Sequence, residues 1–265
     1  KFHKMGARLK VAGSDEGRQR RPLVSDIQID IQNDKKGEYF EIRLNRESRL
    51  VVLVQDVRPQ DRHLLLMARD LDVEPKEIRR FLCGHDERAW FVAAVPEDTP
   101  VSNVNQAMEA LKPEPVLVSQ KRKQVKRGRR NKRRNKGYVR QGEWFFIPRP
   151  ALEVDNKLAL HNEPLSRGRG KPHMAKLLYR QGGVTVYVSR EHPEGLTTEQ
   201  YRRLIRREPA KKNLRWQVMQ RDPEVYVKGK ISHPDHQTID LGIWHQVLPN
   251  TESRSRAMRS LAFLD

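Results

Sequence analysis

The sequence predicts an α+β protein in which two small folded units flank a strongly basic segment. Three observations lead to this prediction. Short apolar segments alternate with turn residues along most of the chain, which is typical of antiparallel sheets. Two segments have the spacing and capping residues of amphipathic helices. Between residues 114 and 137 the composition changes to proline and then to uninterrupted positive charge, which marks a boundary between units.

The first predicted unit spans residues 22–113 and contains a mostly antiparallel sheet. Residues 26–32 alternate strictly between isoleucine and polar side chains, as expected for a half-buried strand. Turn residues at 33–37 separate this strand from its expected partner at 38–44. Further strands are expected at 50–54, 64–67, 79–83 and 90–95. The unit is expected to end in a helix over 104–111, with Ser102 as its N-cap.

Residues 114–137 are predicted to form a basic linker. Positions 121–136 hold eleven Lys or Arg and no acidic residue. Like charges at this density repel, so the segment should be extended in isolation and should become ordered on a polyanion. A solvated, flexible linker is the simpler alternative. The cations predicted to bind phosphates are Lys121, Arg122, Lys123, Lys126, Arg127, Arg129, Arg130, Lys132, Arg133, Arg134 and Lys136.

The second predicted unit, residues 138–250, is β-rich and forms either a small barrel or a partly open sheet. Its strands are expected at 143–147, 184–188, 214–219, 225–231, 237–241 and 243–248. One basic helix is expected over 198–207, capped by Thr197. The chain is expected to begin with a flexible basic arm over 1–21, without the apolar core of a secretory signal, and to end in a basic tail over 251–265.

Two further groups of cations are predicted to contact phosphates. Glycines at 168 and 170 free the backbone of a loop that carries positive side chains, which suits close approach to an anion. On the 198–207 helix, arginines four residues apart repel each other unless an anion compensates them. In both places a solvated surface is the alternative. The residues concerned are Arg167, Arg169, Lys171, Arg202, Arg203, Arg206 and Arg207.

One group of histidines has the residue types of a metal site. His233 and His236 lie three residues apart, and His245 on a following strand is an available third ligand. Pro-Asp between the first two is ordinary turn chemistry, so a hairpin with surface histidines is the favoured interpretation. No metal or other cofactor is therefore expected. No catalytic residue is expected either, since Cys83 and its neighbouring histidine are too close in sequence for a typical catalytic pair.

The charge balance predicts nucleic acid as the partner. The net charge is +19, and removing the eleven cations of 121–136 still leaves +8 on the rest. RNA or a ribonucleoprotein is favoured over DNA, because arginine-rich segments commonly fold on structured RNA. No segment approaches the ~18 apolar residues of a membrane span. The single Cys83 indicates a reducing compartment, the cytoplasm.

Two other functions stay open at this point. The first is a metal-dependent nuclease or phosphotransferase that uses His233, His236 and His245, although a non-enzymatic role is favoured. The second is an adaptor whose N-terminal unit binds a protein partner while the basic half tethers the assembly. Metal analysis distinguishes the enzyme from the binding protein, and protein capture by the N-terminal unit tests the adaptor.

Overall fold

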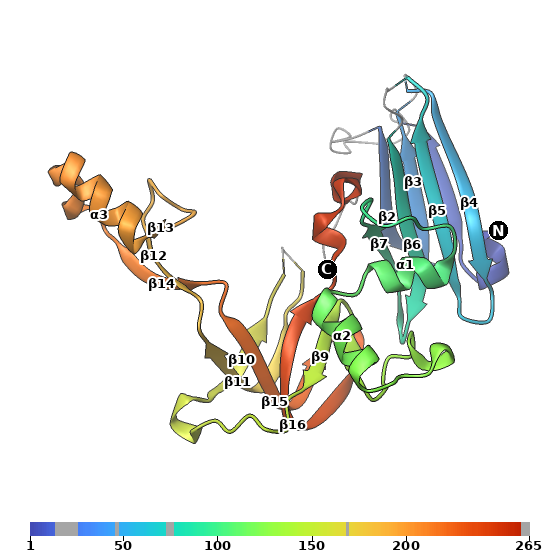
Figure 1. The fold of residues 1–265 in the computed structure, drawn as a ribbon. Helices are drawn as coiled ribbons and strands as arrows, with labels where there is room; N and C mark the ends of the chain where they lie inside the picture. The colour runs from blue at the N-terminus through green and yellow to red at the C-terminus, as the bar shows by residue number, and fades with distance from the viewer. Residues whose placement is uncertain (14–25, 46–47, 73–76, 168–169, 261–265) are drawn as a thin grey trace.

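A computed structural model describes residues 1–13, 26–45, 48–72, 77–167 and 170–260 (Figure 1). Within these ranges the fold is mixed α/β, with four mostly antiparallel sheets and three α-helices. The predicted fold class is confirmed at this level. The described strands form no closed barrel, so the second unit contains open sheets. No α-helix in the described part is long and apolar enough to cross a membrane.

The N-terminal sheet has the strand order β1-β3-β2. Its elements are the 3-10 turn η1 (Phe2–Met5) and the strands β1 (Leu9–Gly13), β2 (Ile27–Asp34) and β3 (Gly37–Leu44). The expected hairpin of β2 and β3 is present, and β1 pairs with β3 in parallel. The arm expected to be flexible is therefore ordered over residues 1–13, because Phe2 and Met5 are buried in the core. Residues 14–25 lie outside the described ranges.

A second, antiparallel sheet packs against the first. It contains β4 (Leu50–Arg58), β5 (His63–Asp70), β6 (Ile78–Asp86) and β7 (Ala89–Val95), in chain order. Leu64 and Leu66 face the first sheet, whereas Leu65 faces α1 (Val104–Ala110) on the other side. The uninterrupted apolar run at 64–67 follows from this arrangement, because both faces of β5 are buried.

The N-cap of α1 differs from the expected residue. Asn103 accepts a hydrogen bond from the Gln106 backbone N–H at 3.0 Å. Ser102 lies one residue earlier and donates its hydroxyl to the Gln106 side chain. Both residue types are good caps, so the sequence alone does not select between adjacent candidates.

The segment expected to be an extended linker begins with a helix. Helix α2 covers Glu114–Arg122 and is followed by the 3-10 turn η2 (Arg127–Arg129). Val116 is buried against the aromatic rings of Tyr138 and Phe145. The charge of this segment concealed its apolar contact, so a helix over 114–122 was not expected within the predicted linker.

The second unit is built on a six-stranded sheet, ordered β10-β11-β15-β16-β9-β8. Its strands are β8 (Val139–Gln141), β9 (Trp144–Pro148), β10 (Leu160–Leu165), β11 (His173–Gln181), β15 (Glu224–His233) and β16 (His236–Pro249), with the 3-10 turn η3 (Asn156–Leu158) before β10. The two strands expected at 237–241 and 243–248 are one long strand, β16. The sheet curls until the β8–β9 turn meets the β15–β16 turn, where the Gln141 amide donates to the Gln237 carbonyl at 2.7 Å.

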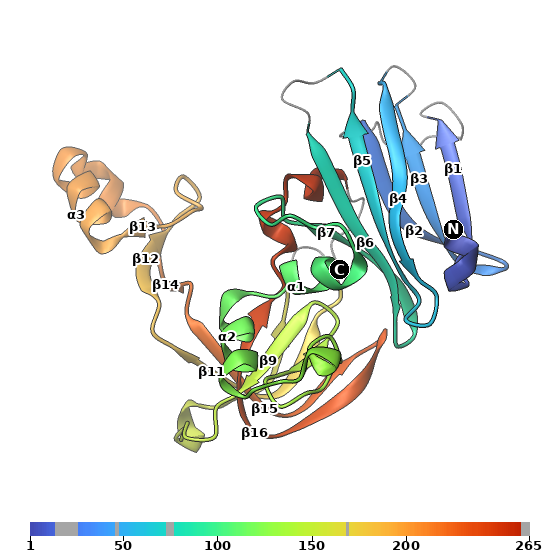
Figure 2. The ribbon, with the colours of Figure 1, turned by 45° about the vertical axis from the view of Figure 1, so that its right-hand side comes forward.

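An arm projects from this sheet (Figures 1 and 2). It contains β12 (Val184–Val188), β13 (Leu196–Thr197), α3 (Thr198–Arg207), the 3-10 turn η4 (Pro209–Asn213) and β14 (Gln217–Arg221). The expected Thr197 cap of α3 is confirmed and forms a reciprocal capping box with Gln200. Tyr187 and Tyr201 stack with ring centroids 4.1 Å apart, which fixes α3 against β12.

The described part of the C-terminal tail returns to the N-terminal sheets. It contains the 3-10 turns η5 (Glu252–Arg254) and η6 (Arg256–Ser260). Ala257 is fully buried in the core between the two sheets. The Glu97 carboxylate accepts hydrogen bonds from the Ser255 hydroxyl at 2.7 Å and the Ala257 N–H at 3.3 Å. The second unit is therefore connected to the first at both of its ends, by the basic segment before residue 138 and by the C-terminal segment after residue 250.

Candidate metal centre and basic surface

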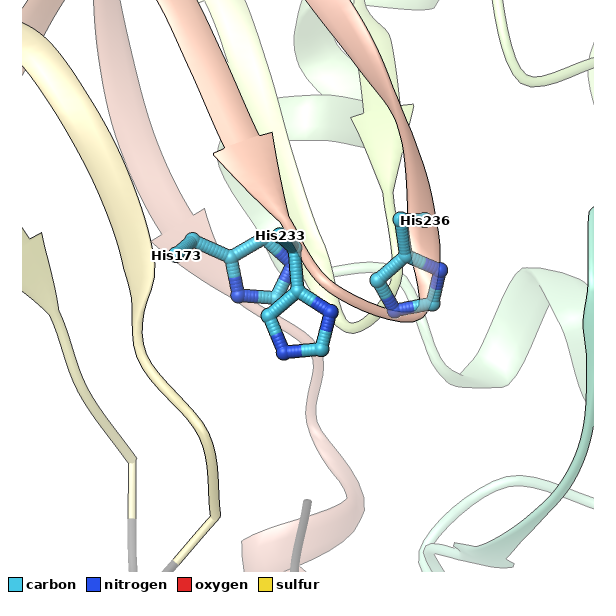
Figure 3. Close-up of side chains that lie close together, drawn as sticks. All are labelled: His173, His233 and His236. Atoms are coloured by element: carbon cyan, nitrogen blue, oxygen red, sulfur yellow. The ribbon is translucent and has the colours of Figure 1, made fainter.

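Three histidines meet where two strand ends lie side by side (Figure 3). His173 begins β11, and His233 and His236 flank the β15–β16 turn. The pairing of β11 with β15 places His173 next to this turn. The His173 ring centroid lies 4.2 Å from that of His233, and one ligand nitrogen from each ring lies within 4.8 Å of the others. We call these three residues the histidine cluster.

The cluster is partly buried and incompletely hydrogen-bonded. His173 is 1% exposed, and neither of its ring nitrogens has a hydrogen-bond partner among the described residues. The same holds for Nδ1 of His236. Burial and the neighbouring His233 lower the pKa of His173 to about 3 and that of His236 to about 4. Both imidazoles are therefore neutral at pH 7 and have a free lone pair.

Gly142, in the turn between β8 and β9, packs directly against the cluster. A Cβ atom at this position would lie 2.7 Å from Nε2 of His236 and 3.3 Å from Nε2 of His173. Its φ of +55° is also a backbone conformation that favours glycine. The close approach of the turn therefore requires glycine here.

Carboxylates flank two of the three rings. Glu143 Oε1 lies 4.0 Å from Nδ1 of His173, and Glu87 Oε2 lies 3.9 Å from Nδ1 of His236. Glu87 belongs to the β6–β7 turn of the N-terminal unit and also accepts the backbone N–H of Gln237. The contact brings an acidic group from one unit to the histidines of the other.

A cleft of about 490 Å³ lies between the two units and opens onto the cluster. Its walls include Asp86 and Trp90 from the N-terminal sheets and Arg140 and Lys171 from the second unit. Both cations are paired, Arg140 with Asp86 at 3.0 Å and Lys171 with Asp235 at 3.0 Å. Neutral imidazoles with nearby carboxylates are a donor set that suits zinc and related divalent ions.

The structure brings together only part of the histidine set considered from the sequence. His233 and His236 are neighbours across the expected hairpin turn, but the third member is His173 rather than His245. His245 is buried on β16, where its Nδ1 bonds the Ile243 carbonyl at 2.8 Å. His173 lies sixty positions before His233 in the chain, so only the strand pairing brings it there.

Cys83 is buried, which raises the pKa of its thiol.

The basic segment is folded into an ordered loop. We define residues 121–136 as the basic loop. Four donors converge on the Arg130 carbonyl oxygen: Lys112 Nζ at 3.0 Å, the Gln120 amide at 2.7 Å, the Tyr138 hydroxyl at 2.8 Å and the Asn135 amide at 3.5 Å. These bonds hold the centre of the loop against α2 and β8.

Most cations of the basic loop point into solvent without an acidic partner. Arg133 is the exception: it is half-buried and pairs with Asp86 and Glu87 beside the cluster. The others are exposed and form no ion pair with any residue in the described ranges. They are Lys121, Arg122, Lys123, Lys126, Arg127, Arg129, Arg130, Lys132, Arg134 and Lys136.

The structure describes two of the three cations predicted to contact phosphates in the glycine-rich loop, Arg167 and Lys171. The Arg167 side chain is only 15% exposed and pairs with Glu252 at 3.0 Å, so it holds the C-terminal segment instead of facing solvent. Arg169 lies outside the described residues. Lys171 is exposed, but its ammonium is paired with Asp235.

Helix α3 presents its arginines in two kinds of environment. Arg203 pairs with Glu199 at 3.1 Å and Arg207 pairs with Glu208 at 2.8 Å. Arg202 and Arg206 are also exposed, and neither has an ion-pair partner in the part of the chain that the structure describes. Of the four predicted arginines, Arg202 and Arg206 are therefore the more available for contact with a phosphate.

Comparisons with models of protein families, with curated proteins and with solved structures give no match. The two features that carry functional information are thus the histidine cluster and the unpaired cations. They are adjacent, because Arg133 of the basic loop contacts Glu87 beside His236. Their charges and donor atoms are the basis for assigning a function.

Proposed function

We propose that this protein binds nucleic acid, with RNA or a ribonucleoprotein as the favoured target. The observation that carries the proposal is the ordered basic loop with its exposed, unpaired cations. A cation without an acidic neighbour can contact a phosphate without first breaking an ion pair. Each such contact releases condensed counterions and so increases the affinity. Arg202 and Arg206 on α3 extend the set of available cations onto the arm.

The order of the loop strengthens this proposal. A disordered tether loses conformational freedom when it binds, and that loss weakens the interaction. Here the Arg130 carbonyl is already held by Lys112, Gln120 and Tyr138. The loop is therefore preorganised, and less of the binding free energy is used in ordering it.

The preference for RNA rests on the shape of the basic surface. Duplex DNA is usually read by a helix or a β-ribbon that lies in the major groove. After the last two residues of α2, the only helical element of the basic loop is the 3-10 turn η2, so its cations are suited to following a backbone rather than to reading base edges.

The test compares two triple variants of the full chain. The loop variant carries Lys126→Gln, Arg127→Gln and Arg129→Gln, all at exposed positions. The control variant removes three exposed cations of the N-terminal unit: Lys4→Gln, Lys35→Gln and Lys36→Gln. Fluorescence anisotropy at fixed salt measures the binding of single-stranded RNA, duplex RNA and duplex DNA.

We expect the loop variant to bind RNA about tenfold more weakly than the wild type, since three phosphate contacts are removed. The control variant should stay close to the wild-type affinity. Equal losses in both variants would mean that only the net charge matters, and the proposal for the loop would fail. Tighter binding of duplex DNA than of either RNA would overturn the RNA preference.

A further inference from the structure

We propose that His173, His233 and His236 bind one divalent transition-metal ion of the zinc class, with a coordination position open to the cleft. The proposal stands apart from nucleic-acid binding, because it depends on the donor atoms of the cluster and not on the basic loop. It also reverses the expectation from sequence that no metal is bound.

The first argument is the unmet bonding capacity of His173. A buried polar group without a partner costs stability, and native structures rarely leave one unexplained. His173 has two such nitrogens, and His236 has one. Each neutral imidazole carries one N–H and one lone pair. A cation placed between lone pairs of neighbouring rings bonds to each ring. A metal ion bonded to one nitrogen of each ring would give His173 one of its missing partners, and the second His173 nitrogen would remain an N–H group.

The second argument is the distance between donors. Tetrahedral zinc with Zn–N bonds of about 2.1 Å places its ligand nitrogens about 3.4 Å apart. The ligand nitrogens of the cluster lie within 4.8 Å of one another. Closing the difference takes small side-chain rotations. His233 and His236 sit at a hairpin tip, where such rotations do not disturb the strand pairing (Figure 3).

One of the two hydrogen bonds of His233 fits this role. Its Nε2 lies 3.2 Å from the Lys171 carbonyl oxygen, and its Nδ1 accepts the Asp235 backbone N–H at 3.1 Å. An Nε2–H group donating to a carbonyl is the contact that commonly orients a metal-bound imidazole. Nδ1 is then the metal-binding atom, once it gives up the hydrogen bond from Asp235.

The third argument is the local charge. A dication requires nearby negative charge, and Glu87 and Glu143 lie about 4 Å from two of the rings. The cations that line the cleft, Lys112, Arg140 and Lys171, are each paired with a carboxylate. Arg133 beside Glu87 is paired as well, so the repulsion of a metal ion by these cations is reduced. The cluster is thus electrostatically compatible with a bound dication.

The open position follows from the number of ligands. Structural zinc sites have four protein ligands, whereas catalytic sites keep three and leave one position for water or substrate. The cluster has three histidines and borders a cleft of about 490 Å³. A water molecule or an anion from the cleft is therefore expected to complete the coordination.

The test measures metal binding by the full chain without nucleic acid. The protein is stripped with a chelator and loaded with zinc, and bound metal is counted by elemental analysis. Cobalt is titrated in parallel, since the visible spectrum of Co²⁺ reports a tetrahedral site. The ligand variants are His173→Gln and His236→Gln. His161→Ala, at an exposed histidine of the same sheet, is the matched control.

The wild type and the His161→Ala variant should hold one equivalent of zinc and show a tetrahedral cobalt spectrum. His236→Gln should lower the zinc affinity at least about 100-fold, because loss of a ligand exceeds the effect of losing its orienting partner. Circular dichroism confirms that each variant is folded. If the loaded wild type holds no zinc, or if both ligand variants bind as tightly as the wild type, the site does not exist.

Discussion

Tyr138 links the core of the second unit to the order of the basic loop. Its ring is 1% exposed and packs edge-on against Phe145, with centroids 5.1 Å apart. Its hydroxyl donates to the Arg130 carbonyl at 2.8 Å. Burial raises the pKa of the phenol to about 12, because the ionised form loses its hydration.

This shift predicts a loss of stability at high pH. In the unfolded chain Tyr138 ionises near pH 10, whereas in the folded protein it keeps its proton up to about pH 12. The folded state therefore binds more protons between these values, and the free energy of unfolding falls as the pH rises through them. A shift of this size corresponds to about 2–3 kcal/mol.

Urea unfolding of the wild type and Tyr138→Phe at pH 9 and at pH 12 measures this effect. Phenylalanine keeps the ring but cannot ionise, so the variant should lose about 2–3 kcal/mol less than the wild type over this interval. Identical losses in the two proteins would show that the phenol is not buried as described.

Residue chemistry alone indicated two members of the histidine cluster but not the third. His233 and His236 are three positions apart, and their hairpin turn was predicted from Pro-Asp. His173 belongs to a distant strand that no alternation of apolar residues revealed. The signal that points to it is structural: the pairing of Met174 with Ser232 sets it beside the turn.

At the scale of elements, the β2–β3 hairpin was predicted from the sequence, whereas helix α2, in the highly charged segment, was not. The β2–β3 hairpin has clear alternation and turn residues, and it forms where expected. Helix α2 was missed because Lys121 and Arg122 suggested repulsion, although Val116 and Gln120 are four residues apart and both are buried. This helical spacing was present but was outweighed by the charge.

Helix α3 offers a comparison between paired and unpaired arginines on one element. In one variant Arg202→Gln and Arg206→Gln remove the two without acidic partners, and in the other Arg203→Gln and Arg207→Gln remove the two that pair with glutamates. We expect the first pair to weaken RNA binding about tenfold. The second pair should have a smaller effect, because its ion pairs must be broken before phosphate is bound.

Anisotropy titrations with the same single-stranded RNA check this prediction, and both variants have the same net charge. A larger loss from the paired arginines would contradict the assignment of Arg202 and Arg206 as contacts. No loss from either variant would restrict the binding surface to the basic loop.

At the scale of the whole molecule, the cleft depends on contacts that local sequence patterns do not encode. The C-terminal segment returns to the N-terminal sheets through Ala257 and Glu97, and the β6–β7 turn reaches the second unit through Glu87. These contacts join residues separated by about 150 positions or more. A sequence pattern reports which residues are apolar or charged, but not which distant turns meet.

The basic loop and the arm lie on different parts of the molecule. The basic loop follows α2 and contacts the β6–β7 turn through Arg133, whereas α3 lies at the end of the projecting arm (Figures 1 and 2). Both present cations without acidic partners. A long nucleic acid can contact both surfaces, and binding at two linked sites is tighter than binding at either one.

The most direct test of the central claim is the dependence of RNA affinity on salt concentration. For a single strand, each phosphate contact contributes about 0.7 to the slope of log affinity against log salt concentration. The loop variant with Lys126→Gln, Arg127→Gln and Arg129→Gln should have a slope about 2 units shallower than the wild type. The control variant with Lys4→Gln, Lys35→Gln and Lys36→Gln should keep the wild-type slope. An unchanged slope in the loop variant would show that the basic loop does not bind phosphates.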